Sequence, residues 1–244
     1  MTTSRFRRIL VALDASPHSR AALEEAAALA VPLQAELTGI FVLDTELLRL
    51  SALPVATETG LTSAQRRTLD PESMERALRM QAERARKALE DTARDHRLEA
   101  TFRLMRGNVM VELLRAARET DLLAMGLMGQ MNLIPSRLGS TVQGVASQAT
   151  CSVLLLSPDA RKGSAVVVVC GRSPNAGSAL TIAGQLAAQR NSPLVVLACA
   201  PEDSAESLRE TIEAQLAQTG AEVLLQAIGP DQFDGLRAAL EDHD

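Results

Sequence analysis

Short apolar segments alternate with longer segments of helical periodicity along this chain. In its first part the apolar segments span residues 9–13, 37–43, 100–105, 122–125 and 153–156. Between them apolar residues recur at helical spacing, and the longest such stripe consists of Met74, Leu78, Ala82, Ala85 and Leu89. Strands that alternate with helices favour right-handed crossovers and a parallel sheet covered on both faces. The pattern therefore predicts a doubly wound α/β fold.

Three positions have the residues that favour a helix start. Ser16-Pro17 follows the first apolar segment, Asp70-Pro71 precedes the long stripe, and Asn108 follows the third apolar segment. A short polar side chain accepts a hydrogen bond from the first turn of a helix, and proline fits the first helical position. We therefore expect helices to begin at these three points.

Residues 44–69 do not fit the alternation. They are polar, show no clear periodicity, and include a proline, a glycine and a pair of arginines. A stretch of this length without secondary structure is unusual inside a compact domain. It is interpreted as a lid over a site, an interaction loop, a disordered stretch or a tolerated surface insertion.

A glycine-rich segment follows the fourth apolar segment. Gly126 and Gly129 open it, Gly139 closes it, and Ser140 and Thr141 come next as candidate N-caps of the last helix. Glycines between a strand and a helix are usually turn residues, but a helix N-terminus behind such a loop also favours a phosphate. The segment is not a P-loop, because no lysine precedes the serine, and it does not follow the first strand as a Rossmann fingerprint does.

The whole segment resembles the nucleotide-binding signature of the universal stress protein family, G-x2-G-x9-G-S/T followed by a helix and a terminal strand. Here it reads Gly126-x2-Gly129-x9-Gly139-Ser140. The N-terminal sequence RRILVALDASPHSRAALEEAAALA is similar to the family's first strand, acidic residue and first helix. The resemblance covers about residues 7–157, and more weakly the rest. It implies a sheet of strand order 3-2-1-4-5.

In a sheet of that order the strand order reverses between the first and fourth strands, where doubly wound folds bind ligands. Asp14 follows the first strand and Gly126 follows the fourth. The resemblance implies that Asp14 is the acidic ligand of the nucleoside, that the main chain at Val42 reads adenine, and that the glycine segment holds phosphates. Arg137 lies inside that segment, where it either faces phosphate or points to solvent. The predicted cofactor-binding set is Leu13, Asp14, Val42, Met125, Gly126, Gly129, Arg137, Gly139, Ser140 and Thr141.

The function implied by the resemblance is a stress-response regulator that binds ATP, AMP or ADP, with or without Mg²⁺ or Mn²⁺. It would act by changing its conformation or its protein partner, which the sequence does not name. The alternative is a slow ATPase or adenylating enzyme of the same broad fold. We identify no catalytic residue, no metal-ligand cluster and no residue to orient a water, so we expect hydrolysis to be weak at most.

The chain repeats part of itself after residue 163. Residues 166–169 echo the first apolar segment, and Ser173-Pro174 echoes Ser16-Pro17. The predicted domains are a nucleotide-binding domain over residues 1–158 and a degenerate, incomplete second repeat over residues 163–244. In the second repeat Gly171 replaces Asp14 and no glycine segment follows. We therefore expect it not to bind nucleotide.

Composition bears on the class of partner. The net charge is −5 and the chain has no Trp or Tyr, which argues against nucleic acid as a partner.

No apolar run reaches the ~18 residues of a membrane span, and the basic N-terminus has no signal-peptide core. We expect a cytoplasmic protein whose three cysteines, Cys151, Cys170 and Cys199, are buried thiols. The resemblance also implies a homodimer paired through the last strand of the first domain.

Overall fold

The computed structural model describes residues 6–53, 57–59, 66–68, 70–127, 139–156, 165–170, 176–199, 210, 212–214, 216 and 223–228. The chain divides into two units, Met1–Pro158 and Asp159–Asp244. The first unit contains a five-stranded sheet, and the second contains a three-stranded one.

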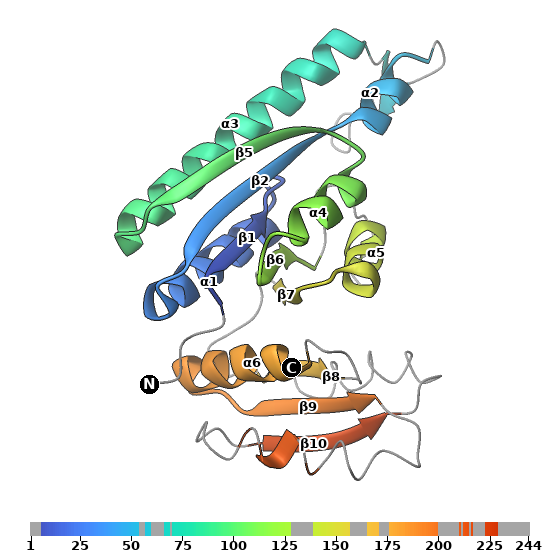
Figure 1. The fold of residues 1–244 in the computed structure, drawn as a ribbon. Helices are drawn as coiled ribbons and strands as arrows, with labels where there is room; N and C mark the ends of the chain where they lie inside the picture. Colours follow the sequence, from blue (N-terminus) through green and yellow to red (C-terminus); the bar gives the residue numbers. More distant parts are fainter. Residues whose placement is uncertain are drawn as a thin grey trace. The chain divides into compact units, whose positions relative to one another are not determined.

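Five parallel strands form the sheet of the first unit (Figure 1). Their order is β5-β2-β1-β6-β7, which confirms the predicted order 3-2-1-4-5 and the doubly wound α/β fold. Each strand lies within two residues of the segment predicted for it. The strands are β1 (Arg8–Ala12), β2 (Glu36–Asp44), β5 (Ala100–Gly107), β6 (Leu122–Gly126) and β7 (Ser152–Leu156).

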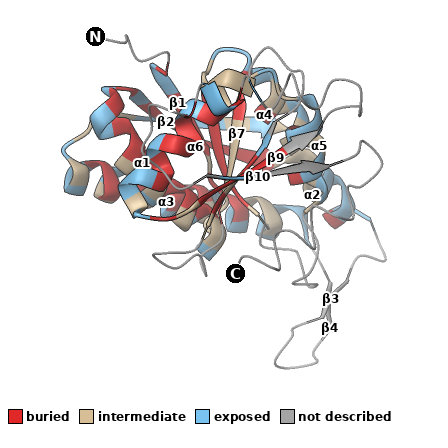
Figure 2. Ribbon diagram, turned by 90° about the horizontal axis from the view of Figure 1, so that it is seen from below, coloured by how far each residue is buried: buried red, intermediate tan, exposed pale blue. Residues whose placement is uncertain are grey.

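Two pairs of helices cover the two faces of this sheet. On one face α1 (Pro17–Leu33) packs against α3 (Pro71–His96), and on the other α4 (Val109–Ala117) packs against α5 (Ser140–Gln148). Buried side chains lie along the strands and on the inner sides of the helices (Figure 2). The core beneath α4 and α5 is aliphatic and includes Leu10, Ile40, Val42, Leu113, Leu123 and Val145.

The three predicted helix starts are confirmed. The Ser16 side chain accepts a hydrogen bond from the Ser19 N–H at 3.1 Å. The Asp70 carboxylate accepts from the N–H groups of Glu72 and Ser73 in the first turn of α3. A hydrogen bond from the Ser73 side chain, together with these N–H groups, holds the pKa of Asp70 below its usual value. The Asn108 side chain accepts from the Val111 N–H at 3.1 Å. Local side-chain chemistry therefore determines where these helices begin.

Part of the segment 44–69 is regular, although its sequence shows no clear periodicity. It begins with a short helix, α2 (Thr45–Ser51), whose N-cap Asp44 accepts from the Glu46 N–H at 2.8 Å. Two strands of three residues, β3 (Thr57–Thr59) and β4 (Arg66–Thr68), pair antiparallel. Elements this short carry too few residues for a hydrophobic period to show in the sequence.

Cys151 is half-buried, so the expectation of a fully buried thiol is too strong at this position. Burial raises the pKa of the Cys151 thiol above its ordinary value. The thiol therefore stays protonated at neutral pH. The side chains of Cys170 and Cys199 lie outside the described part of the structure.

The second unit contains β8 (Val166–Cys170), α6 (Ala176–Arg190), β9 (Leu194–Cys199) and β10 (Val223–Ile228). Its three strands are parallel, in the order β10-β9-β8. This is the order of β5-β2-β1 in the first unit, and it is consistent with a partial second repeat. Within the described parts of both units, no helix has the length and apolar character that crossing a membrane requires.

Candidate functional site

A pocket lies at the carboxyl ends of β1 and β6 in the first unit, where the strand order reverses. Its volume is about 290 Å³. Ligands of doubly wound folds bind at this place because the chain leaves the two strands toward opposite faces. The lining residues are Ala12, Leu13, Asp14, Ser19, Ile40, Phe41, Val42, Val109, Leu113, Met125, Gly126, Gly139, Ser140, Thr141 and Val142.

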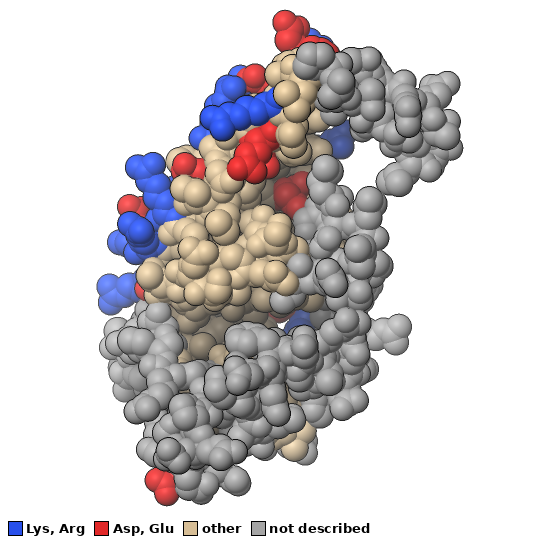
Figure 3. Space-filling view, turned by 90° about the vertical axis from the view of Figure 1, so that its right-hand side faces the viewer, with Lys and Arg blue, Asp and Glu red and all other residues tan. Residues whose placement is uncertain are grey.

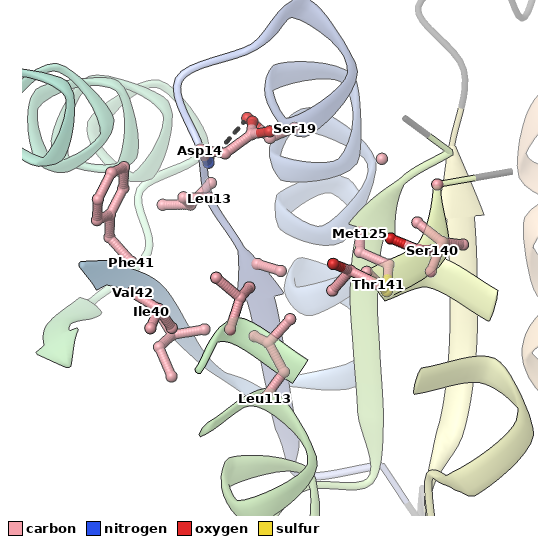
Figure 4. A pocket seen from close by; sticks show the side chains of 15 residues that line it. Leu13, Asp14, Ser19, Ile40, Phe41, Val42, Leu113, Met125, Ser140 and Thr141 are labelled. Atoms are coloured by element: carbon pink, nitrogen blue, oxygen red, sulfur yellow. Dashed lines mark hydrogen bonds between the residues drawn. The ribbon is translucent and has the colours of Figure 1, made fainter. Parts of the chain in front are cut away.

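One side of the pocket is aliphatic. Ile40 and Val42 of β2 belong to the core cluster that also contains Leu113 of α4 and Met125 of β6. Phe41 lies between Ile40 and Val42 in β2, and its ring points away from them (Figure 4). Phe41 therefore contributes to the lining mainly through its main chain. A wall of this kind suits a flat apolar ring.

The acidic residue of the pocket is Asp14, directly after β1. Its half-buried side chain accepts a hydrogen bond from the Ser16 N–H at 2.9 Å. The residue between them, Ala15, has a positive φ of 60°. The neighbouring Leu13 is tied to β2, because its N–H donates to the carbonyl of Ile40 at 2.9 Å. The carboxylate is thus attached to a main chain fixed on both sides.

The N-terminus of α5 lies across the pocket from Asp14 (Figure 4). Its N-cap is Gly139, with φ −59° and ψ 145°, and no side chain caps this end. The prediction that Ser140 or Thr141 is the N-cap is therefore wrong, since both belong to the first turn. The positive φ that favours glycine is also not required at Gly139. A first turn without a side-chain cap leaves N–H groups for a ligand and favours an anion.

Gly126 ends β6 and packs against the start of α1. A Cβ at this position would lie 2.5 Å from the Cβ of His18 and 2.7 Å from its carbonyl carbon. A side chain here would have to displace the main chain of α1. The glycine therefore has a packing reason as well as a place in the pocket lining.

Eight of the ten predicted cofactor-binding residues line this one pocket. They are Leu13, Asp14, Val42, Met125, Gly126, Gly139, Ser140 and Thr141. The other two, Gly129 and Arg137, lie outside the described residues.

Sequence reasoning missed several lining residues. Val109 and Leu113 are four positions apart on α4, and Ile40 alternates with Val42 on β2, so periodicity around the predicted residues was a usable signal. Ser19 was the third residue of a helix with a recognised cap. No motif marked these side chains as ligand-facing, because aliphatic residues in strands and helices are ordinarily core.

Among the described residues, neither the distribution of charged side chains nor the arrangement of metal-ligating side chains indicates a second candidate site. Side chains of both signs are interspersed over the described residues visible in Figure 3, and six ion pairs join neighbouring turns of α3 or its N-cap. Among the residues that the structure describes, no group of three or more His, Cys, Asp or Glu side chains is arranged to hold a metal ion.

The family model described as the universal stress protein family matches residues 5–157, which include every lining residue of the pocket. The chain belongs to the universal stress protein family. No sequence among curated proteins matches it significantly.

Solved structures of universal stress proteins share the fold. The chain is 17% identical to one from Archaeoglobus fulgidus, covering 98% of this chain and 84% of that one, with a TM-score of 0.59. It is 16% identical to a putative universal stress protein from Pseudomonas aeruginosa, covering 99% and 81%, with a TM-score of 0.53. A universal stress protein in complex with cAMP is 21% identical over 64% of this chain and 100% of that one, with a TM-score of 0.42.

Proposed function

We propose that the first unit binds one adenine nucleotide, ATP or its products AMP and ADP, in the pocket between β1 and β6. The observation that carries the proposal is that Asp14 and the uncapped N-terminus of α5 line the same pocket. A carboxylate accepts hydrogen bonds from ribose hydroxyls, and the N–H groups at a helix N-terminus donate hydrogen bonds to phosphate oxygens. A site with both, beside an aliphatic wall, matches the three parts of a nucleotide.

Each part of the nucleotide has its own place in this proposal. The base lies against the aliphatic wall, with its edge at the main chain of Val42 and Phe41. The ribose faces Asp14 beside Leu13, and the phosphates lie at Gly139, Ser140 and Thr141. A volume near 290 Å³ is at the lower end of the ~300–1,000 Å³ typical of ligand pockets, so it suits the nucleoside better than a whole triphosphate. Gly129 and Arg137 stay predicted phosphate contacts.

If Mg²⁺ or Mn²⁺ takes part, we expect its ligands to come mainly from the phosphates of the nucleotide, because the described residues contain no group of three or more His, Cys, Asp or Glu that could hold a metal ion. In sequence the second unit has Gly171 where the first has Asp14, so the proposal places one nucleotide on each chain.

The protein's role in this proposal is that of a cytoplasmic stress-response regulator that changes its conformation or protein partner on binding nucleotide. β7 is an edge strand of the described sheet, and an edge strand has main-chain groups open to pairing. Pairing of β7 with its copy would give a homodimer. A monomer by light scattering at high concentration would contradict this part.

Isothermal titration calorimetry tests the proposal. We expect one ATP per wild-type chain, and an affinity at least tenfold lower for Asp14→Ala, because a hydrogen bond to a charged group contributes about 1.5–3 kcal/mol. Asp91→Ala, which removes an exposed carboxylate from α3, is the control and should leave affinity unchanged. Absence of binding to the wild type, or two nucleotides per chain, would contradict the proposal.

Turnover is expected to be far below the ~10 s⁻¹ that is typical of enzymes. Helix N–H groups hold phosphate oxygens, but they supply no base and place no water in line. Asp14 is assigned to the ribose and not to the terminal phosphate. A steady-state phosphate-release assay with Mg²⁺ or Mn²⁺ measures this. Rates near that value that disappear in Asp14→Ala or Ser140→Ala would favour the enzyme hypothesis instead.

A further inference from the structure

Four hydrogen bonds join Asp14, Ser16 and Ser19, a group that we name the Asp14 turn. The Ser16 N–H donates to Asp14 Oδ1 at 2.9 Å, and the Asp14 N–H donates to Ser19 Oγ at 3.4 Å. The Ser19 N–H donates to Ser16 Oγ at 3.1 Å, and the Ser19 hydroxyl donates to the Ser16 carbonyl at 3.1 Å. Ser16 is 5% exposed and Ser19 is 4% exposed, so solvent competes little for these bonds.

The helix cap accounts for only one of these bonds. Capping α1 requires the Ser16 side chain and the Ser19 N–H, which an alanine at position 19 would still supply. The Ser19 hydroxyl does something different. It accepts from the Asp14 N–H and donates to the Ser16 carbonyl, and so links the residues on either side of Ala15, which has the positive φ. A non-glycine residue in that conformation is unfavourable unless its surroundings fix it.

The hydroxyl of Ser19 can donate only one hydrogen bond, and it donates that bond to the Ser16 carbonyl. Although Ser19 lines the pocket, its hydroxyl cannot also donate to a ligand there without breaking this bond. Figure 4 shows Ser19 beside Asp14, joined to it by the hydrogen bond from the Asp14 N–H. As a donor, the hydroxyl therefore acts within this turn and not on a ligand, and its link to the acidic residue of the pocket is the bond that it accepts from the Asp14 N–H.

We propose that Ser19 is a positioning residue, which fixes the direction of the Asp14 carboxylate toward the pocket and so sets the preference for a ribose with both hydroxyls. This inference rests on the proposed nucleotide function. The mechanism is preorganisation: a carboxylate that is already oriented loses less freedom when it accepts the ribose hydroxyl.

The test is calorimetry of ATP, 2′-deoxy-ATP and 3′-deoxy-ATP with wild type and Ser19→Ala. We expect the wild type to bind at least one deoxy analogue more weakly than ATP. Ser19→Ala should weaken ATP binding about three- to tenfold, as the loss of one hydrogen bond does. Ser19→Ala should weaken binding of the weaker-binding deoxy analogue by a smaller factor, so that the ratio of the affinity for ATP to the affinity for this analogue falls. In an Asp14→Ala background, Ser19→Ala should have no further effect on affinity.

Ser51→Ala is the matched control. Ser51 is 1% exposed and its hydroxyl makes the same bond to the carbonyl three residues earlier, Leu48, at 2.8 Å, but it does not line the pocket. We expect Ser51→Ala to leave both affinity and ribose preference unchanged. Ser19→Cys, which keeps a weak donor at the same position, should fall between wild type and Ser19→Ala, and it serves as the test variant if Ser19→Ala does not fold.

The outcomes separate this inference from the proposed function. Failure of the wild type to bind any nucleotide overturns the proposed function and this inference with it. Binding of ATP by the wild type with no preference over either deoxy analogue overturns the inference alone. So does an equal loss for ATP and both analogues in Ser19→Ala or Ser19→Cys, because a merely structural serine would affect all three ligands alike.

Discussion

Gly126→Ala is expected to lower the free energy of unfolding of the first unit by about 2 to 3 kcal/mol, and Gly126→Val to prevent its folding. The added Cβ would lie 2.5 Å from the Cβ of His18 and 2.7 Å from its carbonyl carbon. The second of these atoms is main chain, so the conflict can be relieved only by moving the start of α1 away from β6. Such a shift would disturb a core that is packed at crystal-like density.

Urea unfolding followed by circular dichroism measures this loss, and Gly107→Ala is the control. A Cβ at Gly107 would lie 2.9 Å from Cγ and from Oε1 of Glu112, which belong to a flexible side chain. That side chain can rotate away, so we expect Gly107→Ala to cost less than about 1 kcal/mol. Equal losses in the two variants would show that the contact with α1 is not the reason for glycine at position 126.

Gly139→Val is expected to have the opposite profile, with ATP affinity at least about 30-fold lower and a loss of stability of only about 1 kcal/mol, because valine is a poorer N-cap than glycine. The backbone of Gly139, with φ −59° and ψ 145°, is open to any residue, so the fold has no conformational need for glycine here. The same residue lines the pocket at the N-terminus of α5. Three added carbon atoms there would occupy the space proposed for the phosphates.

Calorimetry with ATP measures the affinity, and thermal melting without ligand measures the stability. Gly139→Ala provides a graded comparison, and we expect its affinity to lie between wild type and Gly139→Val. If Gly139→Val binds ATP like the wild type, the phosphates do not lie at this helix end. If it unfolds instead, Gly139 is a structural glycine like Gly126.

The contrast between these two glycines shows what sequence can and cannot predict. The glycine segment was predicted to lie between a strand and a helix, and the structure has β6 before it and α5 behind it. It did not show that Gly126 makes room for α1, since that neighbour is more than a hundred residues away in the chain. It also placed the N-cap at Ser140 or Thr141 instead of Gly139, because serine and threonine side chains can cap a helix and glycine has no side chain to do so.

Elements defined by their own residues were predictable. Alternating apolar segments located every strand of the first sheet, and capping residues located the starts of α1, α3 and α4. The short helix α2 was missed, because seven residues do not establish a period and its cap, Asp44, belongs to a strand. Ser19 was missed as a member of the site because its importance depends on a hydrogen bond to Asp14, and no pattern of residue types predicts a contact of that kind.

The pocket joins two distant parts of the chain, and this has a consequence during protein synthesis. β1 pairs with β6 at Leu10 and Leu123, and the Arg7 N–H donates to Asp121 Oδ2 across 114 positions. A growing chain must therefore release the whole of β6 and the start of α5 before the pocket exists. Closing so long a loop delays the central pairing. A ligand that needs both parts of the pocket, as the proposed nucleotide does, would stabilise only chains in which this pairing has already formed.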